Sequence, residues 1–536
     1  MAKNVLFIMC DQLRFDYLSC YGHPHLKTPN IDALAAKGVK FNNAYVQSPI
    51  CGPSRMSYYT GRYVRSHGST WNGTPLRIGE PTLGKHLKEI GVRNVLIGKT
   101  HMRADIEGMQ TLGIDPTSDI GMFNAQCGFE VYERDDGLHP NEQQGISPRY
   151  NDYLNENGFE GDNPWQSWAN SAQGENGELL SGWLMENADK AARIPDYYSE
   201  TPYLTRRAMQ FIDEADDTPW CLHLSYIKPH WPYMAPAPYH NLYNTSHMLN
   251  ANRTPQERIN AHPLQQAYMQ HFVCETFSRD EVRDKVIPTY MGLVKQIDDQ
   301  LGLLFDHLEK HNLTKNTLIV FTADHGDYLG DHWMGEKELF HEPSVKVPLI
   351  IYNPDTAADC SRGTCCEQLI ESIDLVPTFI EFLGGQPKYN ILEGKSLIDL
   401  LKGNQSPLRE FAFSEYDYAM RQAREALNVE VKNARIVMVR DLRYKYTYIQ
   451  GMRPTLFDLQ SDPQEQIDIA TDPHSSDICH RFDTALTEWA LKHHNRITIT
   501  DSDIIKHTGR EADAGILIGY WDTEDLNKVK QKGRDF

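Results

Sequence analysis

The sequence predicts an α/β fold in which helices flank a large, mostly parallel sheet, followed by a smaller antiparallel sheet. In the first half, short apolar runs alternate with helical patterns, as in a sheet that is covered on both faces. After about Gly403 the apolar runs become shorter and β-rich. The strands expected in the large sheet are residues 4–10, 93–98, 221–227, 318–323 and 348–352.

Local signals place the helices. One helix is expected from Pro29 to Gly38 and another from Cys51 to Gly61, because proline favours a first turn and glycine an end. Apolar residues at spacings of three and four indicate a long amphipathic helix over residues 294–308. In the C-terminal part, strands are expected at residues 411–413, 436–440 and 444–449, and a helix at residues 478–493.

These elements suggest three parts of the chain. Residues 1–403 are expected to form a catalytic domain, with an insertion at about 104–195 over one face of the sheet. Residues 404–494 are expected to form a smaller α+β domain. Residues 495–536 are polar and irregular. We interpret them as an arm that wraps a neighbouring subunit, which predicts a homo-oligomer, a dimer or a tetramer.

Composition restricts the class of partner. The 536 residues carry a net charge of -20, which argues against nucleic acid or an anionic membrane as the main partner. An anionic substrate therefore needs a site that is made positive locally. No secretory signal or membrane-spanning run is visible, so we expect a soluble, cytoplasmic protein. The ten scattered cysteines are typical of reduced thiols, with Cys51 the exception discussed below.

Polar side chains follow four of the predicted strands. The segments are Asp11-Gln12, Lys99-Thr100-His101, Lys228-Pro229-His230 and Asp324-His325-Gly326-Asp327. Because the carboxyl ends of parallel strands share one edge of a sheet, where ligands bind, we expect these groups to form one site.

The acidic members of this set suit a metal ion. Asp11, Asp324 and His325 could hold a divalent cation, with Gln12 as a further oxygen donor. Mostly oxygen ligands favour Ca²⁺, Mg²⁺ or Mn²⁺ over Zn²⁺. The spacing alone leaves a second interpretation open, since Asp-His pairs also occur as hydrogen-bonded couples.

The segment that begins at Cys51 has the strongest pattern. Cys51 precedes Gly52 and Pro53 at the predicted start of a helix, where free amides and the helix dipole favour negative charge. The pattern is compatible with a thiolate of low pKa, or with a capped helix that buries a structural cysteine.

These residues together resemble the sulfatase family. Cys51-Gly52-Pro53-Ser54-Arg55 with Thr60-Gly61 is similar to the family signature, which is also the recognition sequence of the formylglycine-generating enzyme. The resemblance continues along nearly the whole chain. Its further elements are Asp11-Gln12, residues 28–32, 98–101, 229–232 and 322–326, Lys337, and residues 373–378, 443–446, 456–459 and 462–463.

The resemblance implies an alkaline-phosphatase-like fold and a formylglycine nucleophile made from Cys51. Asp11, Gln12, Asp324, His325 and the residue at position 51 resemble the ligands of one divalent metal, for which Ca²⁺ is expected first and Mn²⁺ as the alternative. Gln12 stands where many sulfatases have a second aspartate. The remaining site residues that the resemblance implies are Arg55, which holds the hydrated aldehyde; Lys99, His101, His230 and Lys337, which bind the transferred group and move protons; and Asn72, which touches substrate.

The branch of the family is predicted from Lys99 and His101. This pair is typical of true sulfatases, so arylsulfatase-type hydrolysis of a small sulfate ester is expected first. Asp11-Gln12, the residues from Gly326 to His332 and the C-terminal arm resemble phosphonate monoester hydrolases and phosphodiesterases, which remain the alternative. Choline-sulfatases also share the Asp-Gln pair, so an alkyl sulfate is an alternative substrate. A protein of this fold that binds anions without turnover is a further alternative, of a different class.

Overall fold

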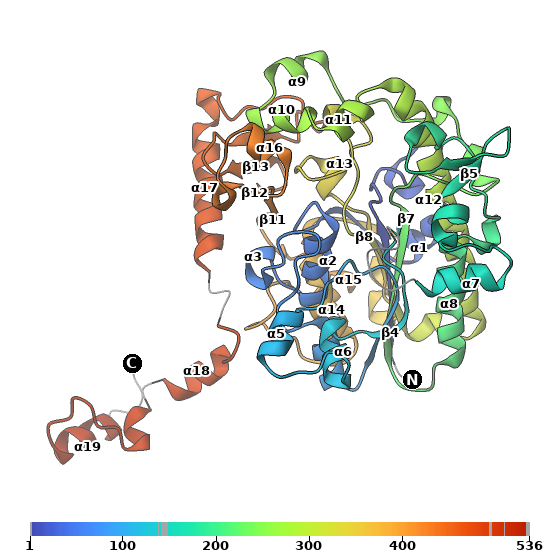
Figure 1. Cartoon of the computed structure of the whole chain (residues 1–536). Coiled ribbons are helices and arrows are strands. Elements are labelled where there is room, and N and C mark those ends of the chain that lie inside the picture. Colours follow the sequence, from blue (N-terminus) through green and yellow to red (C-terminus); the bar gives the residue numbers. More distant parts are fainter. Residues whose placement is uncertain (1–2, 138, 141–147, 493–495, 509, 532–536) are drawn as a thin grey trace.

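The computed structural model of the chain describes residues 3–137, 139–140, 148–492, 496–508 and 510–531 (Figure 1). Its largest feature is an eight-stranded sheet in which, among the described strands, β9 alone runs antiparallel to its neighbours. In spatial order the strands are β10 (Thr364–Glu371), β2 (Val39–Tyr45), β9 (Leu349–Tyr352), β8 (Thr317–Ala323), β1 (Asn4–Asp11), β7 (Trp220–Pro229), β3 (Arg93–Gly98) and β4 (Glu130–Arg134).

Helices cover both faces of this sheet, which explains why its central strands are apolar throughout. Every residue of β1, β7 and β8 is buried. Figure 1 shows one group of helices on the right of the sheet, α1 (Pro29–Lys37), α8 (Glu200–Glu214) and α12 (Asp280–Lys310), and another on the left, which includes α2 (Cys51–Thr60) and α14 (Leu375–Phe382). Shorter helices are α3 (Val64–His67), α4 (Leu83–Glu89), α9 (Pro255–Asn260), α10 (Pro263–Met269), α11 (Phe272–Phe277), α13 (Glu342–Val345), α15 (Ile398–Leu401) and α16 (Gln422–Ala426).

A smaller antiparallel sheet follows in the C-terminal part of the chain. Its order is β11 (Ala412–Asp417), β12 (Arg435–Arg440), β13 (Tyr444–Ile449) and β14 (Thr455–Asp458), and α17 (Ser476–Leu491) packs against it. The Trp489 ring of α17 stacks on Phe413 of β11, with 4.8 Å between the ring centroids. The predicted architecture, a mostly parallel sheet between helices with a second antiparallel sheet, is confirmed.

Residues 104–195 add both an edge strand and a separate subregion. Strand β4 extends the large sheet and follows the helices α5 (Ile106–Thr111) and α6 (Asp119–Ala125). After it come α7 (Arg149–Glu156) and the two-stranded sheet of β5 (Ser171–Gln173) and β6 (Leu179–Ser181).

The C-terminal segment that contains the last two helices leaves the body of the molecule. Figure 1 shows α18 (Asp501–His507) and α19 (Thr523–Gln531) extending away from both sheets. Ile518 and Trp521 in this segment are 87% and 90% exposed. Among the described residues, no helix combines the length and apolar character that a membrane span requires.

Candidate active site

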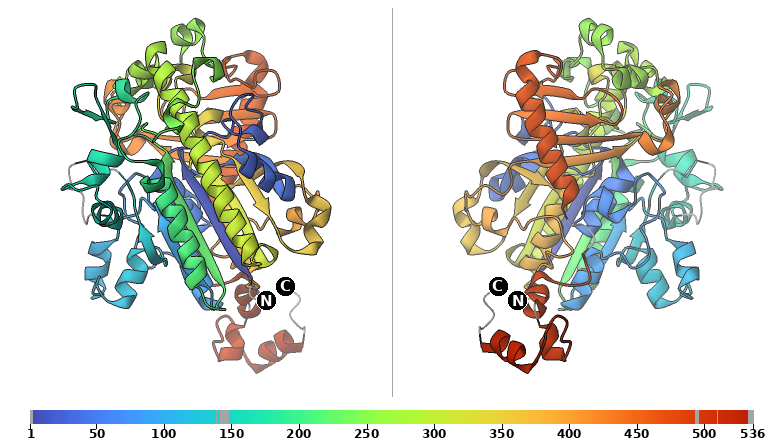
Figure 2. Two further views of the ribbon diagram at one scale, coloured as in Figure 1. Left: turned by 90° about the vertical axis from the view of Figure 1, so that its right-hand side faces the viewer. Right: turned by 90° about the vertical axis from the view of Figure 1, so that its left-hand side faces the viewer.

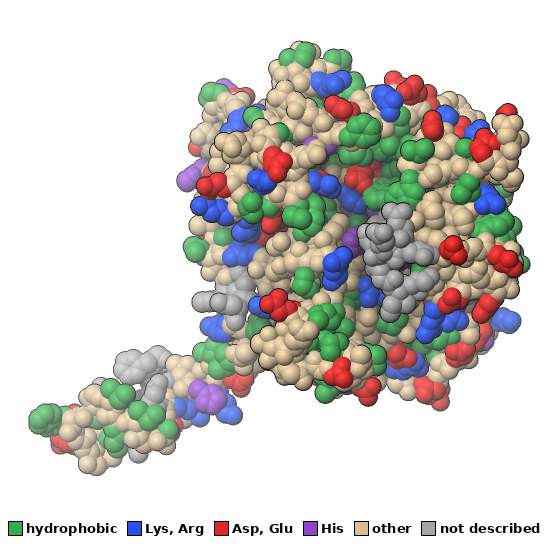
Figure 3. Space-filling model, viewed as in Figure 1, with side chains coloured by type: hydrophobic (Ala, Val, Ile, Leu, Met, Phe, Trp, Pro, Cys, Tyr) green, Lys and Arg blue, Asp and Glu red, His purple; other side chains and the backbone are tan. Residues whose placement is uncertain are grey.

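The sheet order places the four predicted strand ends side by side. Strands β8, β1, β7 and β3 are consecutive neighbours and all run in the same direction. Their carboxyl ends therefore carry Asp324 and His325, Asp11 and Gln12, Lys228 and His230, and Lys99 and His101 to one edge. In Figure 3, basic side chains and a histidine gather near the middle of the face shown, although the whole chain is acidic.

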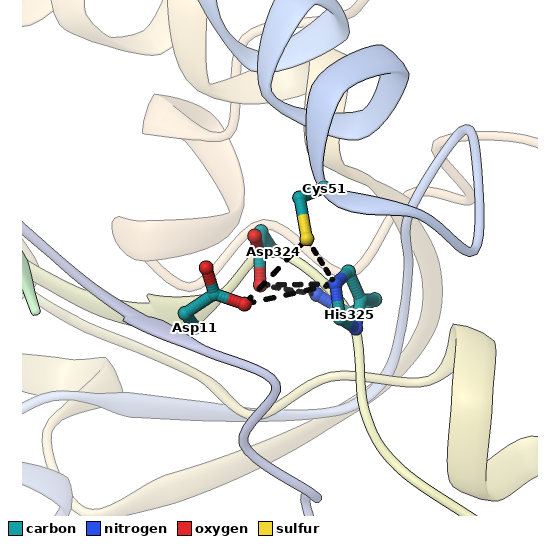
Figure 4. A group of neighbouring side chains, drawn as sticks. All are labelled: Asp11, Cys51, Asp324 and His325. Carbon is teal, nitrogen blue, oxygen red and sulfur yellow. Dashed lines mark hydrogen bonds and ion pairs between the residues drawn. The ribbon is translucent and has the colours of Figure 1, made fainter. Parts of the chain in front are cut away.

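Cys51 is the first residue of α2 and points into this edge. Its Sγ lies 3.1 Å from His325 Nε2 and 3.7 Å from Asp11 Oδ1 (Figure 4). Lys337 Nζ lies 3.3 Å from the same Sγ. Asn72 accepts the backbone N–H of Gly52 at 2.7 Å. A Cβ atom at position 52 would lie 2.9 Å from Asn72 Oδ1, so the glycine permits this close approach.

The acidic groups converge beside Cys51 as a metal site requires. Donor atoms of Asp11, Cys51, Asp324 and His325 all lie within 4.8 Å of one another, and all four residues are buried. His325 Nδ1 lies 2.8 Å from the Gly326 carbonyl, and a proton donated there leaves the Nε2 lone pair facing the carboxylates. Two carboxylates and one neutral imidazole suit a divalent cation, so these residues fit the metal that the sequence implies.

Gln12 contacts other side chains of the site. Its Oε1 accepts a hydrogen bond from Lys337 Nζ at 3.0 Å, and its Nε2 donates to Asp327 Oδ2 at 2.5 Å. The backbone N–H of Gln12 donates to Asp324 Oδ1. In this structure the Gln12 amide therefore links Lys337 to Asp327.

Buried cations balance the carboxylates. Arg55 Nε lies 2.8 Å from Asp324 Oδ2, and its Nη2 lies 3.4 Å from Asp11 Oδ2. Lys99 also forms an ion pair with Asp11. Burial opposes ionisation of Asp11, yet Lys99 and Arg55 hold its pKa well below the usual range.

Positive charge also acts on position 51, where Lys99 is joined by Lys337. Burial would raise the pKa of the Cys51 thiol, but Lys337, Lys99 and His325 lower it well below its ordinary value. Any group at this position that develops negative charge is stabilised by the same neighbours.

His230 faces this cluster as a neutral base. Burial lowers the pKa of His230, and its Nδ1 lies 2.7 Å from the Trp231 carbonyl. Its Nε2 lies 3.3 Å from Lys337 Nζ, which donates to it. Lys228, by contrast, turns to Asn170 and the Pro232 carbonyl, so it supports the loop and stays out of the group around Cys51.

Asp136 is a site residue that the sequence analysis missed. Its Oδ1 accepts the backbone N–H groups of Thr100 and His101, each at 2.8 Å. His101 has a φ of 55°, a conformation that a non-glycine residue adopts rarely, so these bonds fix a strained loop. The signal was the acidic pair Asp135-Asp136 after a strand, but β4 lies in the region of weak periodicity and was not predicted.

An aromatic pocket lies beside His230. Its volume is about 120 Å³, well below the roughly 300 Å³ of a site for a drug-sized ligand. The Trp231 ring packs on His230 with 4.3 Å between centroids, and Trp183 meets Trp231 edge-on. The pocket is lined by Gly182, Trp183, Met185, Trp231, Pro232, Tyr233, Val273, Phe277 and Glu336.

Comparison with known proteins identifies the family of the chain. The Sulfatase family model matches residues 3–385, and a model named N-sulphoglucosamine sulphohydrolase, C-terminal, matches residues 330–492. The multifunctional alkaline phosphatase superfamily protein PehA of Trinickia caryophylli is 32% identical, over 92% of this chain and 96% of that protein. An arylsulfatase of Clostridium perfringens is 26% identical, over 87% of this chain and 89% of that protein.

The fold has the same relatives. A phosphonate monoester hydrolase from Silicibacter pomeroyi superimposes with a TM-score of 0.81 at 27% identity, covering 92% of this chain and 97% of that one. The alkaline-phosphatase-like fold that the sequence implied is thereby confirmed. From the family match over most of the chain, together with these relatives, we conclude that the protein is a hydrolase of the sulfatase family.

Proposed function

We propose that the protein hydrolyses sulfate monoesters of aryl alcohols, with formylglycine made from Cys51 as nucleophile and one divalent cation as cofactor. The observation that carries this proposal is the set of cationic and imidazole groups at Cys51. Lys337 contacts Cys51 directly, and Lys99 lies close enough to lower the pKa of its thiol. The chain as a whole has a net charge of -20, which repels a sulfate group. The two lysines, with the histidines beside them, make the site locally favourable for this anion.

The donor atoms of the site indicate which residues would hold the cation. Asp11, Asp324 and His325 would hold the cation, with Ca²⁺ favoured by the carboxylates and Mn²⁺ tolerating the imidazole nitrogen. When present, the cation supplies positive charge against the sulfate oxygens, and the hydrated aldehyde at position 51 supplies a hydroxyl nucleophile.

The protein side chains supply the remaining chemistry. Arg55, fixed by Asp11, Asp324 and the Lys99 carbonyl, keeps the metal-binding carboxylates in place. Lys99 and Lys337 offset negative charge on the transferred group. His101 is assigned to accept the proton of the second hydroxyl at position 51. Lys337, which His230 positions through their hydrogen bond, is assigned to protonate the leaving oxygen.

The aromatic pocket supports an aryl leaving group. Its walls include Trp183, Trp231 and Phe277. Trp183 donates its N–H outward to Gln166 and Tyr233 donates its hydroxyl to Asp327, so their ring faces remain available to an apolar group.

Maturation is proposed to precede folding. Cys51, Pro53 and Arg55, which belong to the recognition sequence, are all buried. A formylglycine-generating enzyme must reach an extended chain at this sequence, so it would act before α2 is enclosed.

The exposed apolar residues of the C-terminal segment support a homo-oligomer. Ile518 and Trp521 would be covered by a second copy of the chain. A chain that lacks residues 495–536 is expected to show a smaller mass in light scattering, and unchanged assembly would refute this part of the proposal.

Phosphonate monoester or phosphodiester hydrolysis is the second candidate. It is favoured by the similarity to the phosphonate monoester hydrolase of Silicibacter pomeroyi and by Gln12 in place of a second aspartate.

One experiment separates the two candidates. The same aryl group is presented as a sulfate monoester, a phosphonate monoester and a phosphodiester, and kcat/KM is compared, with Cys51→Ala as the blank. We expect the sulfate to be preferred. A preference for the phosphonate or the diester would favour the second candidate, and turnover by the blank would contradict both.

A further inference from the structure

A second group of metal-ligand side chains lies far from the active site, where α8 and α12 end. Asp213 belongs to the last turn of α8, His307 to the last turn of α12, and His311 follows α12 directly. These helices lie side by side along one face of the sheet (Figure 2) and end at the edge where the strands begin. We infer that Asp213, His307 and His311 form a binding site for a transition-metal ion, Zn²⁺ in the first place.

The geometry of the three donor atoms supports this site. Asp213 Oδ1 lies 2.9 Å from His307 Nε2 and 3.3 Å from His311 Nε2. Ligands at about 2.1 Å from a tetrahedral Zn²⁺ stand roughly 3.4 Å apart. The observed distances thus require only a small opening of the cluster, and the fourth position remains for water.

The end of α12 brings the two histidines together, with their rings tilted by 35°. A spacing of four residues places them on one face, with 4.4 Å between the ring centroids. Both Nε2 atoms face the same carboxylate oxygen. If both rings were protonated, two positive charges would share one carboxylate at this short distance, whereas one cation can accept both lone pairs.

The hydrogen bonding of His307 adds a separate observation. Its Nε2 is buried, yet it has no hydrogen bond of good geometry among the described atoms, although Asp213 Oδ1 is close. The buried trio of Glu257, His332 and His341 differs in this respect. There His332 bonds to Glu257, and His341 bonds to the Tyr328 hydroxyl. Of the two trios, only the surface trio has a histidine nitrogen without a hydrogen bond, although Glu257 Oε2 in the buried trio also lacks one.

The ligand chemistry selects the kind of metal. Two imidazoles and one carboxylate favour Zn²⁺, Co²⁺ or Ni²⁺ over Ca²⁺. The active-site cluster, with two carboxylates, has a different preference. A metal at the surface site would join α8 to α12 and so stabilise the packing of these helices on the sheet.

Equilibrium dialysis against Zn²⁺, followed by elemental analysis, tests the site in the full-length protein. His311→Ala and the double variant His307→Ala/His311→Ala are compared with wild type. We expect wild type to bind one Zn²⁺ more than the double variant. Loss of an outer-shell partner lowers metal affinity by roughly ten- to a hundredfold. His311→Ala removes a direct ligand, so we expect it to raise the Kd of that ion by at least this factor. His474→Ala, which removes an exposed histidine elsewhere, is the matched control and should bind like wild type.

A second measurement reports on the ligands themselves. Co²⁺ bound to wild type should give the visible absorption of a four-coordinate site, which the double variant should lack. Hydrolytic activity that is unchanged in all variants would show that they fold. Equal Zn²⁺ stoichiometry and Kd in wild type and the double variant would overturn the inference, as would an equal loss in His474→Ala.

Discussion

Asp136 Oδ1 accepts the backbone N–H of His101 at 2.8 Å and so anchors the loop that follows β3. Arg134 Nε bonds to the other carboxylate oxygen at 2.7 Å. Burial opposes ionisation of Asp136, but Arg134 and the backbone N–H groups of His101 and Thr100 lower its pKa below the ordinary value. The carboxylate is therefore charged at any working pH and acts on the chemistry through the position of His101.

Replacing Asp136 tests this positioning. Asp136→Ala is expected to lower kcat for an aryl sulfate by about ten- to a hundredfold, which corresponds to the roughly 1.5–3 kcal/mol of a hydrogen bond to a charged group. Asp136→Asn keeps an acceptor oxygen and should recover part of the loss. The pH profile of kcat should change in Asp136→Ala if His101 moves. An unaltered profile with a loss in KM alone would mean that Asp136 is merely structural.

Metal affinity should distinguish Asp324 from Gln12. Asp324→Asn is expected to abolish the rise in thermal stability that Ca²⁺ or Mn²⁺ gives wild type, about 2.7 kcal/mol at a hundredfold excess over Kd. Gln12→Ala should retain most of this stabilisation and lose activity, because the Gln12 amide bonds to Lys337 and Asp327. Calorimetric titration of both variants provides the measurement. Equal losses of affinity would identify Gln12 as a direct ligand.

The aromatic pocket predicts a substrate-dependent effect. Trp183→Ala is expected to raise KM for aryl sulfates by about two- to thirteenfold, from the roughly 0.5–1.5 kcal/mol of one aromatic pair. KM for a short alkyl sulfate should stay constant, and Trp183→Phe should behave almost like wild type. If Trp183→Ala affects the aryl and alkyl esters equally, the pocket does not hold the leaving group.

Glu415 predicts how stability depends on pH. It lies on β11, and its Oε2 accepts the backbone N–H of Arg65 near the start of α3. Burial raises its pKa from 4.5 to about 7. A raised carboxyl pKa stabilises the fold fully below pH 4.5, and this contribution is lost as pH rises towards 7, by about 3 kcal/mol.

The matched variants isolate this contribution. In Glu415→Gln, the free energy of unfolding from urea titrations should fall less than in wild type between pH 4.5 and 7. Glu410→Gln, which alters a side chain that is 72% exposed, is the control. Parallel pH curves for wild type and Glu415→Gln would contradict the prediction.

Much of the site follows from the sequence because parallel strands impose a simple geometry. The apolar runs that end at Asp11, Lys99 and Asp324 lie on parallel strands of one sheet, β1, β3 and β8, so polar residues directly after them share one edge. The contacts of the Gln12 amide with Lys337 and Asp327 could not be predicted, because they depend on the fold of a loop that is distant in sequence.

Strands β4 and β2, towards the two margins of the large sheet, were among the elements that the sequence analysis missed. Strand β4 is partly exposed and reads EVYER, without a continuous apolar run. Strand β2 alternates polar and apolar residues because it lies towards one edge of the sheet, between β10 and β9. The antiparallel direction of β9 has no signature in its sequence, since a short apolar run is equally suited to either direction.

The most direct test of the proposed chemistry is the mass of the peptide that contains position 51, taken from fully active protein. The proposal predicts a peptide in which one oxygen has replaced the sulfur and two hydrogens of Cys51, in proportion to the specific activity of each preparation. The buried thiol with its lowered pKa offers a different nucleophile. An unmodified cysteine at position 51 in fully active protein would therefore contradict the formylglycine mechanism.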